Sequence, residues 1–146
     1  MKTADSKISE HLFVYGTLRS ESTHPMAGRL RAGAKLIDKG STSGLLYDLG
    51  AYPGAVFAAG ERRRIIGEVF RLGAHARLLA RLDRYEGITG AEDDMLNRLL
   101  VEVRLDRGGI VEAWAYGLRI TPRARVIGTG DFIADRSSRS QKTMCP

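Results

Sequence analysis

Glu86 occupies a position in the sequence that could give its carboxyl group a catalytic role. Leucines at 78, 79 and 82 follow a helical spacing, which predicts a helix over about residues 74–85 with a buried apolar stripe. Glu86 comes four residues after Leu82, so it continues this stripe at the C-terminal end of the helix. Burial and the negative end of the helix dipole both disfavour a carboxylate and raise its pKa. A carboxyl group with such a pKa can act as a general acid and base near neutral pH. The alternative is that Glu86 caps a neighbouring backbone group or lies at a rim.

A second candidate is the segment Tyr15-Gly16-Thr17-Leu18-Arg19, which follows a short apolar run. A strand that ends in Gly-Thr exposes successive backbone N–H groups, and glycine permits the backbone geometry that turns them inward. Such a nest binds anions, for example a carboxylate. The same residues are also compatible with an ordinary transition from strand to loop.

Several other kinds of chemistry are poorly supported. The three histidines, His11, His24 and His75, are far apart and lack the spacing of helical metal ligands. Cys145 is the single cysteine, so no internal disulfide and no cysteine-based metal site can form. The sequence contains no G-x-S-x-G elbow, no P-loop and no complete G-x-G-x-x-G fingerprint. We therefore expect neither zinc chemistry, nor serine hydrolysis, nor a nucleotide phosphate site.

The length of 146 residues, 43% of them hydrophobic and 27% charged, is typical of one globular domain. The net charge of +6, from 23 Lys+Arg and 17 Asp+Glu, raises the question of a nucleic-acid partner. Apart from Arg62-Arg63-Arg64 the basic residues are dispersed, and aromatic residues do not interleave with them, so we expect a solvated surface and no nucleic-acid partner. A lone cysteine and the absence of a long apolar segment predict a cytoplasmic protein without a membrane anchor.

The elements expected around these candidates form an α+β fold with a curved or closed sheet. Residues 1–10 are expected to be flexible, residues 11–133 to form the domain, and the basic residues 134–146 to be disordered. The expected strands and helices, in chain order, are a strand over 11–15, a short helix over 26–31, one bent strand or two short ones within 34–49, strands at 55–58 and 65–71, the helix over 74–85 with Gly87 as its stop, a hairpin of two strands around 106–109, and a last turn or short helix at 128–133.

Six short blocks, taken in series, resemble the gamma-glutamylcyclotransferase-like (AIG2-like) family. They span about residues 12–133 and occur in the order found in the family. The blocks are Phe13-Val14-Tyr15-Gly16-Thr17-Leu18-Arg19, Gly44-Leu45-Leu46-Tyr47-Asp48-Leu49-Gly50 with Tyr52-Pro53-Gly54, Gly67-Glu68-Val69-Phe70, Leu82-Asp83-Arg84-Tyr85-Glu86-Gly87, Trp114-Ala115-Tyr116 and Gly130-Asp131-Phe132.

This resemblance implies a small mixed β-barrel flanked by one main helix and one or two short ones. It implies that Glu86 is the catalytic general acid and base, and that Tyr15, Gly16, Thr17 and Leu18 form the loop whose backbone holds a γ-glutamyl group. The implied substrate is a small γ-glutamyl amine or amino acid, cyclised to 5-oxoproline without a metal or cofactor. A non-catalytic small-molecule binding domain with the same barrel is the alternative. The oligomeric state is left open.

Three features near the implied site have two interpretations each. The family usually has a tyrosine two residues before an arginine; here Arg98 matches, but Leu96 replaces the tyrosine, which favours the non-catalytic alternative. The acidic residues 92–94 could attract a cationic leaving amine or could simply be solvated. Tyr52 and Tyr116 could line the pocket or could belong to the core with their hydroxyl groups satisfied.

Overall fold

A computed structural model describes residues 10–16, 25–50, 52–72 and 76–137. It confirms the α+β class. The elements, in chain order, are β1 (His11–Val14), α1 (Pro25–Gly33), β2 (Lys35–Asp48), β3 (Pro53–Phe57), β4 (Arg64–Arg71), α2 (Ala76–Tyr85), β5 (Leu96–Leu105), β6 (Ile110–Leu118) and β7 (Arg125–Val126).

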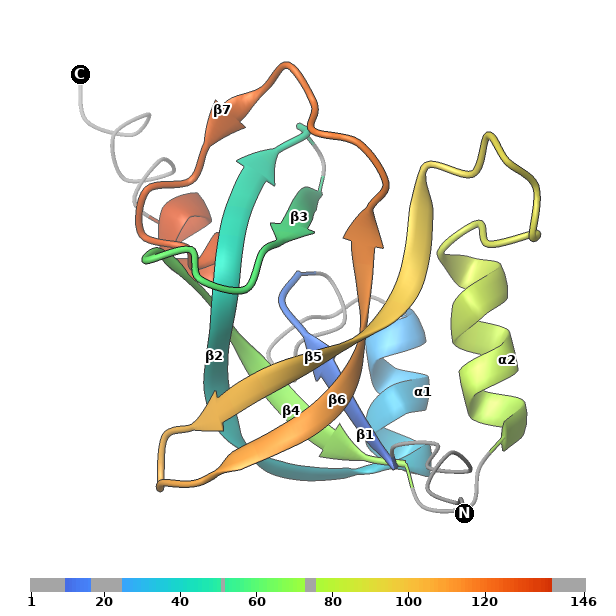
Figure 1. Ribbon diagram of the computed structural model, residues 1–146. Coiled ribbons are helices and arrows are strands. Elements are labelled where there is room, and N and C mark those ends of the chain that lie inside the picture. Colours follow the sequence, from blue (N-terminus) through green and yellow to red (C-terminus); the bar gives the residue numbers. More distant parts are fainter. Residues whose placement is uncertain (1–9, 17–24, 51, 73–75, 138–146) are drawn as a thin grey trace, which may run out of the picture.

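The strands form a barrel (Figure 1). The order of the sheet is β3-β2-β4-β1-β6-β5, and a further pairing of β2 with β5 joins the ends of the path β2-β4-β1-β6-β5 into a ring. The segment 34–49, for which one bent strand or two were expected, is the single strand β2. Its register with β4 shifts between Leu36 and Asp38, and this long bent strand also pairs with β3 and β7.

Strand β1 lies inside the sheet, antiparallel to β4 and parallel to β6. Its alternate side chains enter two different apolar clusters: Phe13 belongs to the barrel interior, whereas Leu12 and Val14 belong to a cluster that also contains Leu82 of α2. Because both faces of β1 are buried, its sequence is a continuous apolar run rather than an alternating one.

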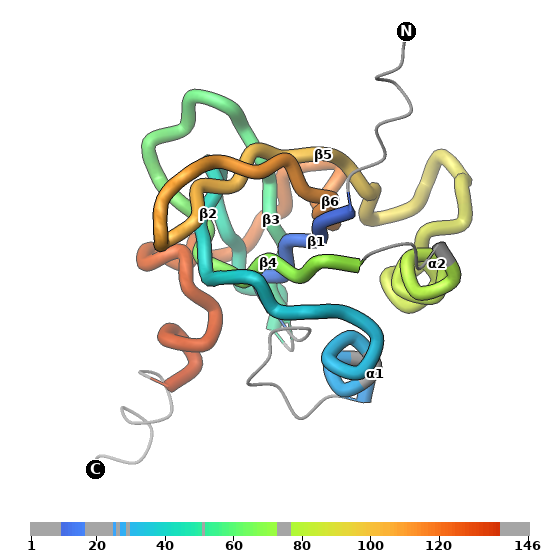
Figure 2. Tube along the Cα trace, turned by 90° about the horizontal axis from the view of Figure 1, so that it is seen from below, coloured from blue at the N-terminus to red at the C-terminus, as the bar shows by residue number. Residues whose placement is uncertain are grey.

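Helices α1 and α2 lie side by side on one flank of the barrel (Figures 1 and 2). Leu82 is fully buried, whereas Arg77, Arg81 and Arg84 are exposed, as the predicted stripe requires. Helix α2 ends at Tyr85, and Gly87, two residues further on, has a φ of +79°.

Two backbone hydrogen bonds close the end of α2. The N–H group of Gly87 donates to the Arg84 carbonyl at 3.1 Å, and the N–H group of Ile88 donates to the Asp83 carbonyl at 2.9 Å. These two bonds form a Schellman motif, in which glycine is favoured at the left-handed position. The motif places Glu86 directly after the last helical residue, between Tyr85 and Gly87.

Residues 132–137 form a further short helix on the opposite flank of the barrel from α1 and α2 (Figure 2). Asp131 accepts a hydrogen bond from the Ala134 amide at the start of this helix, and Arg125 pairs with Asp135 within it at 2.8 Å. Among the described residues, no helix has the length and apolar character needed to cross a bilayer.

Candidate functional site

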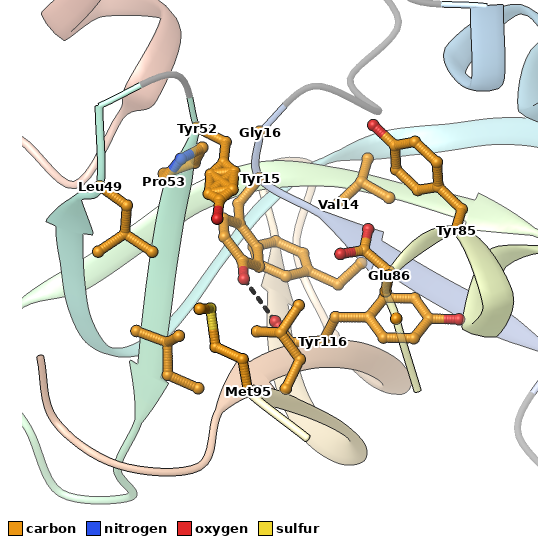
Figure 3. A pocket seen from close by; sticks show the side chains of 14 residues that line it. Val14, Tyr15, Gly16, Leu49, Tyr52, Pro53, Tyr85, Glu86, Met95 and Tyr116 are labelled. Carbon is orange, nitrogen blue, oxygen red and sulfur yellow. Dashed lines mark hydrogen bonds between the residues drawn. The ribbon is translucent and has the colours of Figure 1, made fainter. Parts of the chain in front are cut away.

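A cavity of about 480 Å³ opens where β1 ends, beside the C-terminus of α2, the start of β5 and the turn between β2 and β3 (Figure 3). Its volume is within the range of small-molecule sites. The described residues that line it are Phe13, Val14, Tyr15, Gly16, Leu49, Tyr52, Pro53, Tyr85, Glu86, Gly87, Met95, Leu96, Tyr116 and Leu118.

Glu86 is the only side chain among these lining residues that carries a carboxyl group. Figure 3 shows this group pointing into the cavity, among Val14, Tyr85 and Tyr116. Burial raises the pKa of Glu86 from its ordinary value of 4.5 to about 7, because the charged form is poorly solvated there. Within the described part of the chain, no group forms a hydrogen bond or ion pair with the carboxyl group, so it does not cap a backbone group there.

Tyr116 on β6 forms one wall next to Glu86 and is buried. Its hydroxyl group donates a 2.6 Å hydrogen bond to Asp83 Oδ1, and Arg98 approaches the same oxygen at 3.2 Å. The Arg98 guanidinium also lies over the Trp114 ring, 4.5 Å from its centre. This network joins α2, which carries Glu86, to the two strands β5 and β6.

Tyr15 connects the cavity to the barrel interior. It is buried, its ring meets Phe57 edge-on at 5.9 Å, and its hydroxyl group donates to the Tyr116 carbonyl. Burial, with a smaller contribution from the charge of Glu86, raises the pKa of Tyr15 well above its usual range. Tyr15 is therefore a neutral hydrogen-bond donor at the cavity wall.

Gly16 lines the cavity directly after β1. A Cβ atom at this position would lie 2.8 Å from Pro53 Cγ, so the close approach of β1 to the β2–β3 turn requires glycine. The other two residues of the expected anion-binding loop, Thr17 and Leu18, lie outside the described residues. The structure thus brings Gly16 to the cavity without describing the rest of that loop.

Tyr52 and Tyr116, for which the sequence allowed two interpretations, both line the cavity, but in different ways. Tyr116 also fits the core interpretation, because it is 4% exposed and its hydroxyl group is satisfied. Tyr52 is 43% exposed and lies at the rim. Sequence reasoning did not identify the lining residues Leu49, Pro53, Tyr85, Met95 and Leu118. The apolar stripe of α2 includes Tyr85, so the helical spacing was the one signal that could have placed Tyr85 on the side of the helix that faces the cavity.

The acidic residues 92–94 do not line the cavity. Asp94 instead organises its own loop: its two carboxylate oxygens accept hydrogen bonds from the amide and hydroxyl groups of Thr89 and from the amide of Gly90. These bonds lower the pKa of Asp94. In the part of the chain that the structure covers, no three His, Cys, Asp or Glu side chains are grouped as a metal site would require.

The fold and the cavity define a small barrel protein in which one carboxyl group, that of Glu86, lies among the described residues that line a small-molecule-sized cavity. The sequence profile of the family described as "Gamma-glutamyl cyclotransferase, AIG2-like" matches residues 12–134. The chain therefore belongs to this family, and the resemblance found in the six sequence blocks is confirmed. None of the curated proteins compared with the chain matches it significantly.

Solved structures with the same fold support this assignment. YkqA from Bacillus subtilis is 26% identical, with a TM-score of 0.70 over 92% of this chain and 43% of YkqA, so this chain spans less than half the length of YkqA. The protein PH0828 from Pyrococcus horikoshii is 28% identical, with a TM-score of 0.64 over 91% of this chain and 98% of that protein. An AIG2-like protein from Mus musculus has a TM-score of 0.68 over 84% of this chain and 87% of its own; at 21% identity it shows the shared fold.

Proposed function

We propose that the protein is a cyclotransferase that converts a γ-glutamyl amide into 5-oxoproline and a free amine, with Glu86 as general acid and base. The observation that carries this proposal is the Glu86 carboxyl group, which points into the cavity with a pKa near 7 and no protein partner among the described residues. Membership of the family supports the reaction type.

Glu86 takes part in two proton transfers of the proposed reaction. The α-ammonium group of the γ-glutamyl substrate passes one proton to the Glu86 carboxylate, and the resulting neutral amine attacks the side-chain carbonyl carbon, which forms the five-membered ring. The bond from this carbon to the leaving nitrogen then breaks; the leaving nitrogen takes one proton from the ring nitrogen and one from Glu86, and departs as an ammonium ion. Glu86 returns to its starting state, no water is consumed, and substrate and products balance.

The raised pKa of Glu86 makes the first transfer nearly balanced. An α-amino group has a pKa of roughly 7.7–8.0, so transfer to a carboxylate with a pKa of about 7 is uphill by only about 1 kcal/mol. An ordinary carboxylate of pKa 4.5 would require about 4.5 kcal/mol. Ring closure within one molecule also supplies a proximity advantage of up to about 7–11 kcal/mol in well-oriented cases.

The backbone around Gly16 is the proposed site for the carbonyl oxygen and the α-carboxylate. Backbone N–H groups that follow β1 would stabilise the negative charge on the oxygen as the carbon becomes tetrahedral. Tyr15 and Tyr116 form the adjacent wall, and Tyr52 the rim. In this proposal Thr17 and Leu18 continue the same backbone loop.

The proposal is tested by incubating the protein with a panel of γ-glutamyl amines and γ-glutamyl amino acids and following the mixture by NMR. We expect equimolar 5-oxoproline and free amine from at least one compound. Saturable binding of these compounds without any 5-oxoproline would support the alternative, a non-catalytic binding domain. The observation that favours this alternative is Leu96, which lines the cavity where the family usually has a tyrosine.

A further inference from the structure

The cavity has two chemically different ends. Figure 3 shows Leu49, Tyr52 and Pro53 across the cavity from Glu86. We call this the apolar end; the residues that form it are Leu49, Tyr52, Pro53, Met95, Leu96 and Leu118. None of these six side chains carries a charge, and none carries an amide group.

The apolar end is built by a close approach of two leucines to strand β3. A Cβ atom at Gly54 would lie 2.6 Å from Leu118 Cδ1 and 2.8 Å from Leu49 Cδ1, so these side chains pack directly against the backbone of β3. Glycine at this position therefore allows leucine methyl groups from the end of β6 and from the β2–β3 turn to form one apolar surface.

Four of the backbone polar groups at this end are paired with one another. The Leu49 amide donates to the Tyr52 carbonyl at 3.0 Å, and the Arg119 amide donates to the Met95 carbonyl at 3.0 Å. Groups satisfied in this way offer little to a charged ligand, because a charge placed on apolar surface needs a compensating partner.

The acidic loop does not supply that partner. Both carboxylate oxygens of Asp94 are bound to Thr89 and Gly90 within the loop, and the exposed Glu92 and Asp93 are not among the residues that line the cavity. Among the described lining residues, a cationic leaving group would find only Glu86, whose proposed task is proton transfer.

We infer that the leaving half of the substrate is an uncharged hydrocarbon group held at the apolar end, so that the enzyme acts on γ-glutamyl amides of apolar amines or apolar amino acids. This inference rests on the proposed cyclotransferase function. With the γ-glutamyl group at Glu86 and Gly16, the chain beyond the scissile nitrogen extends towards Leu49, Met95 and Leu118. A hydrocarbon chain there exchanges water for methyl and methylene contacts, whereas an ammonium group loses hydration without gaining a partner.

The test compares two γ-glutamyl amides of equal size, γ-glutamyl-n-pentylamide and γ-glutamyl-(4-aminobutyl)amide, which differ by a terminal methyl in place of an ammonium group. We expect kcat/KM to be at least about tenfold higher for the pentylamide, since small apolar differences in a pocket are worth about 10- to 200-fold. An equal or higher value for the aminobutyl compound would overturn the inference. γ-Glutamylnorleucine is the pentylamide with an added α-carboxylate, and it shows whether the leaving group is a simple amine or an amino acid. A lower kcat/KM than that of the pentylamide identifies a simple amine, and an equal or higher kcat/KM identifies an amino acid.

Two variants separate the apolar end from overall charge. Met95 lines the cavity and is 59% exposed, so Met95→Glu places a carboxylate at the rim without burying it. We expect this variant to shift the ratio of the two kcat/KM values at least fivefold towards the aminobutyl compound. Ile120 is 79% exposed and does not line the cavity, so Ile120→Glu adds the same charge and should leave the preference unchanged. Equal shifts in both variants would contradict the assignment of the apolar end.

The failure of this inference can be distinguished from failure of the proposed function. Turnover of both amides without preference would contradict only the inference about the leaving group. If neither amide releases 5-oxoproline, the proposed reaction fails for these compounds, and calorimetric binding of the same pair still measures the preference of the apolar end. Tighter binding of the pentylamide supports that preference, and equal binding contradicts it.

Discussion

The hydroxyl group of Tyr116 donates a 2.6 Å hydrogen bond to Asp83 Oδ1, which joins strand β6 to helix α2. Asp83 precedes Glu86 by three residues, so the bond holds the last turn of the helix that presents Glu86. Burial, followed by the bond to Asp83, raises the pKa of Tyr116 well above its usual range, so the hydroxyl group remains a donor. Asp83 and Tyr116 are in this account positioning residues for Glu86.

Tyr116→Phe tests this positioning. The substitution removes the donor but keeps the ring, and it leaves the ion pair between Asp83 and Arg98 in place. We expect kcat to fall about tenfold with little change in KM, and the free energy of unfolding to fall by about 1–3 kcal/mol. Steady-state kinetics and urea unfolding measure the two effects.

Arg98→Gln is the matched control for this bond. It removes the ion pair with Asp83 but keeps the Tyr116 hydroxyl group, so we expect a smaller loss of kcat than in Tyr116→Phe. If Tyr116→Phe loses stability but keeps the wild-type kcat and pH profile, the bond has a structural role only.

Glu86 should make the folded protein less stable as pH rises. Its pKa is 4.5 as an ordinary side chain and about 7 in the fold, so below about pH 4.5 it is protonated in both states and costs nothing. Between these values the unfolded chain releases the proton first, and the free energy of unfolding declines. Above about pH 7 the full cost, at most about 3 kcal/mol, is present.

Glu86→Gln removes this cost. We expect the variant to gain stability over the wild type between pH 4.5 and 7, and to keep that gain at pH 8. Urea unfolding at pH 4 and pH 8 measures the difference. Glu102→Gln, at an exposed position on β5, should change stability by less than about 0.5 kcal/mol at both values. A gain for Glu86→Gln that is the same at both pH values would show that Glu86 does not titrate as described.

Gly87→Ala tests the turn that fixes Glu86. A Cβ atom at Gly87 has nothing within 4 Å, so the cost comes from its φ of +79° and is about 1 kcal/mol. Relief of this strain would shift the turn next to Glu86, and we expect kcat to fall several-fold. Differential scanning calorimetry and steady-state kinetics measure the two effects.

Gly90→Ala is the control for backbone strain. Gly90 also has a positive φ, +90°, with nothing near its Cβ position, but it lies in the acidic loop and does not line the cavity. It should lose similar stability and keep its kcat. Equal losses of kcat in the two variants would mean that the turn at Gly87 has no special connection to the site.

The sequence was most informative where one periodic element fixes the position of a side chain. The leucine stripe of α2 placed Glu86 on the buried side, and the short apolar run at 11–15 indicated the strand β1, both faces of which the structure shows to be buried. Gly67, within the expected strand 65–71, lies at a close approach of two strands, since a Cβ atom there would be 2.3 Å from the Val14 carbonyl oxygen.

Relationships between distant elements were not predictable from the sequence. Periodicity shows which face of an element is buried but not which element covers it, so the bond between Tyr116 and Asp83, 33 residues apart, left no local signal. The same holds for the leucines at 49 and 118, which both pack against the backbone at Gly54, where a side chain would collide with them. The acidic loop had two interpretations because its composition does not show that Asp94 bonds within the loop.

The central claim, that Glu86 transfers protons during cyclisation, is tested most directly by the pH dependence of 5-oxoproline formation in the wild type and in Glu86→Gln. We predict a limb in the wild-type kcat/KM profile with a midpoint near pH 7, and in Glu86→Gln a loss of about a hundredfold or more together with loss of that limb. Retention of the wild-type rate, or of the limb near pH 7, in Glu86→Gln would contradict the account.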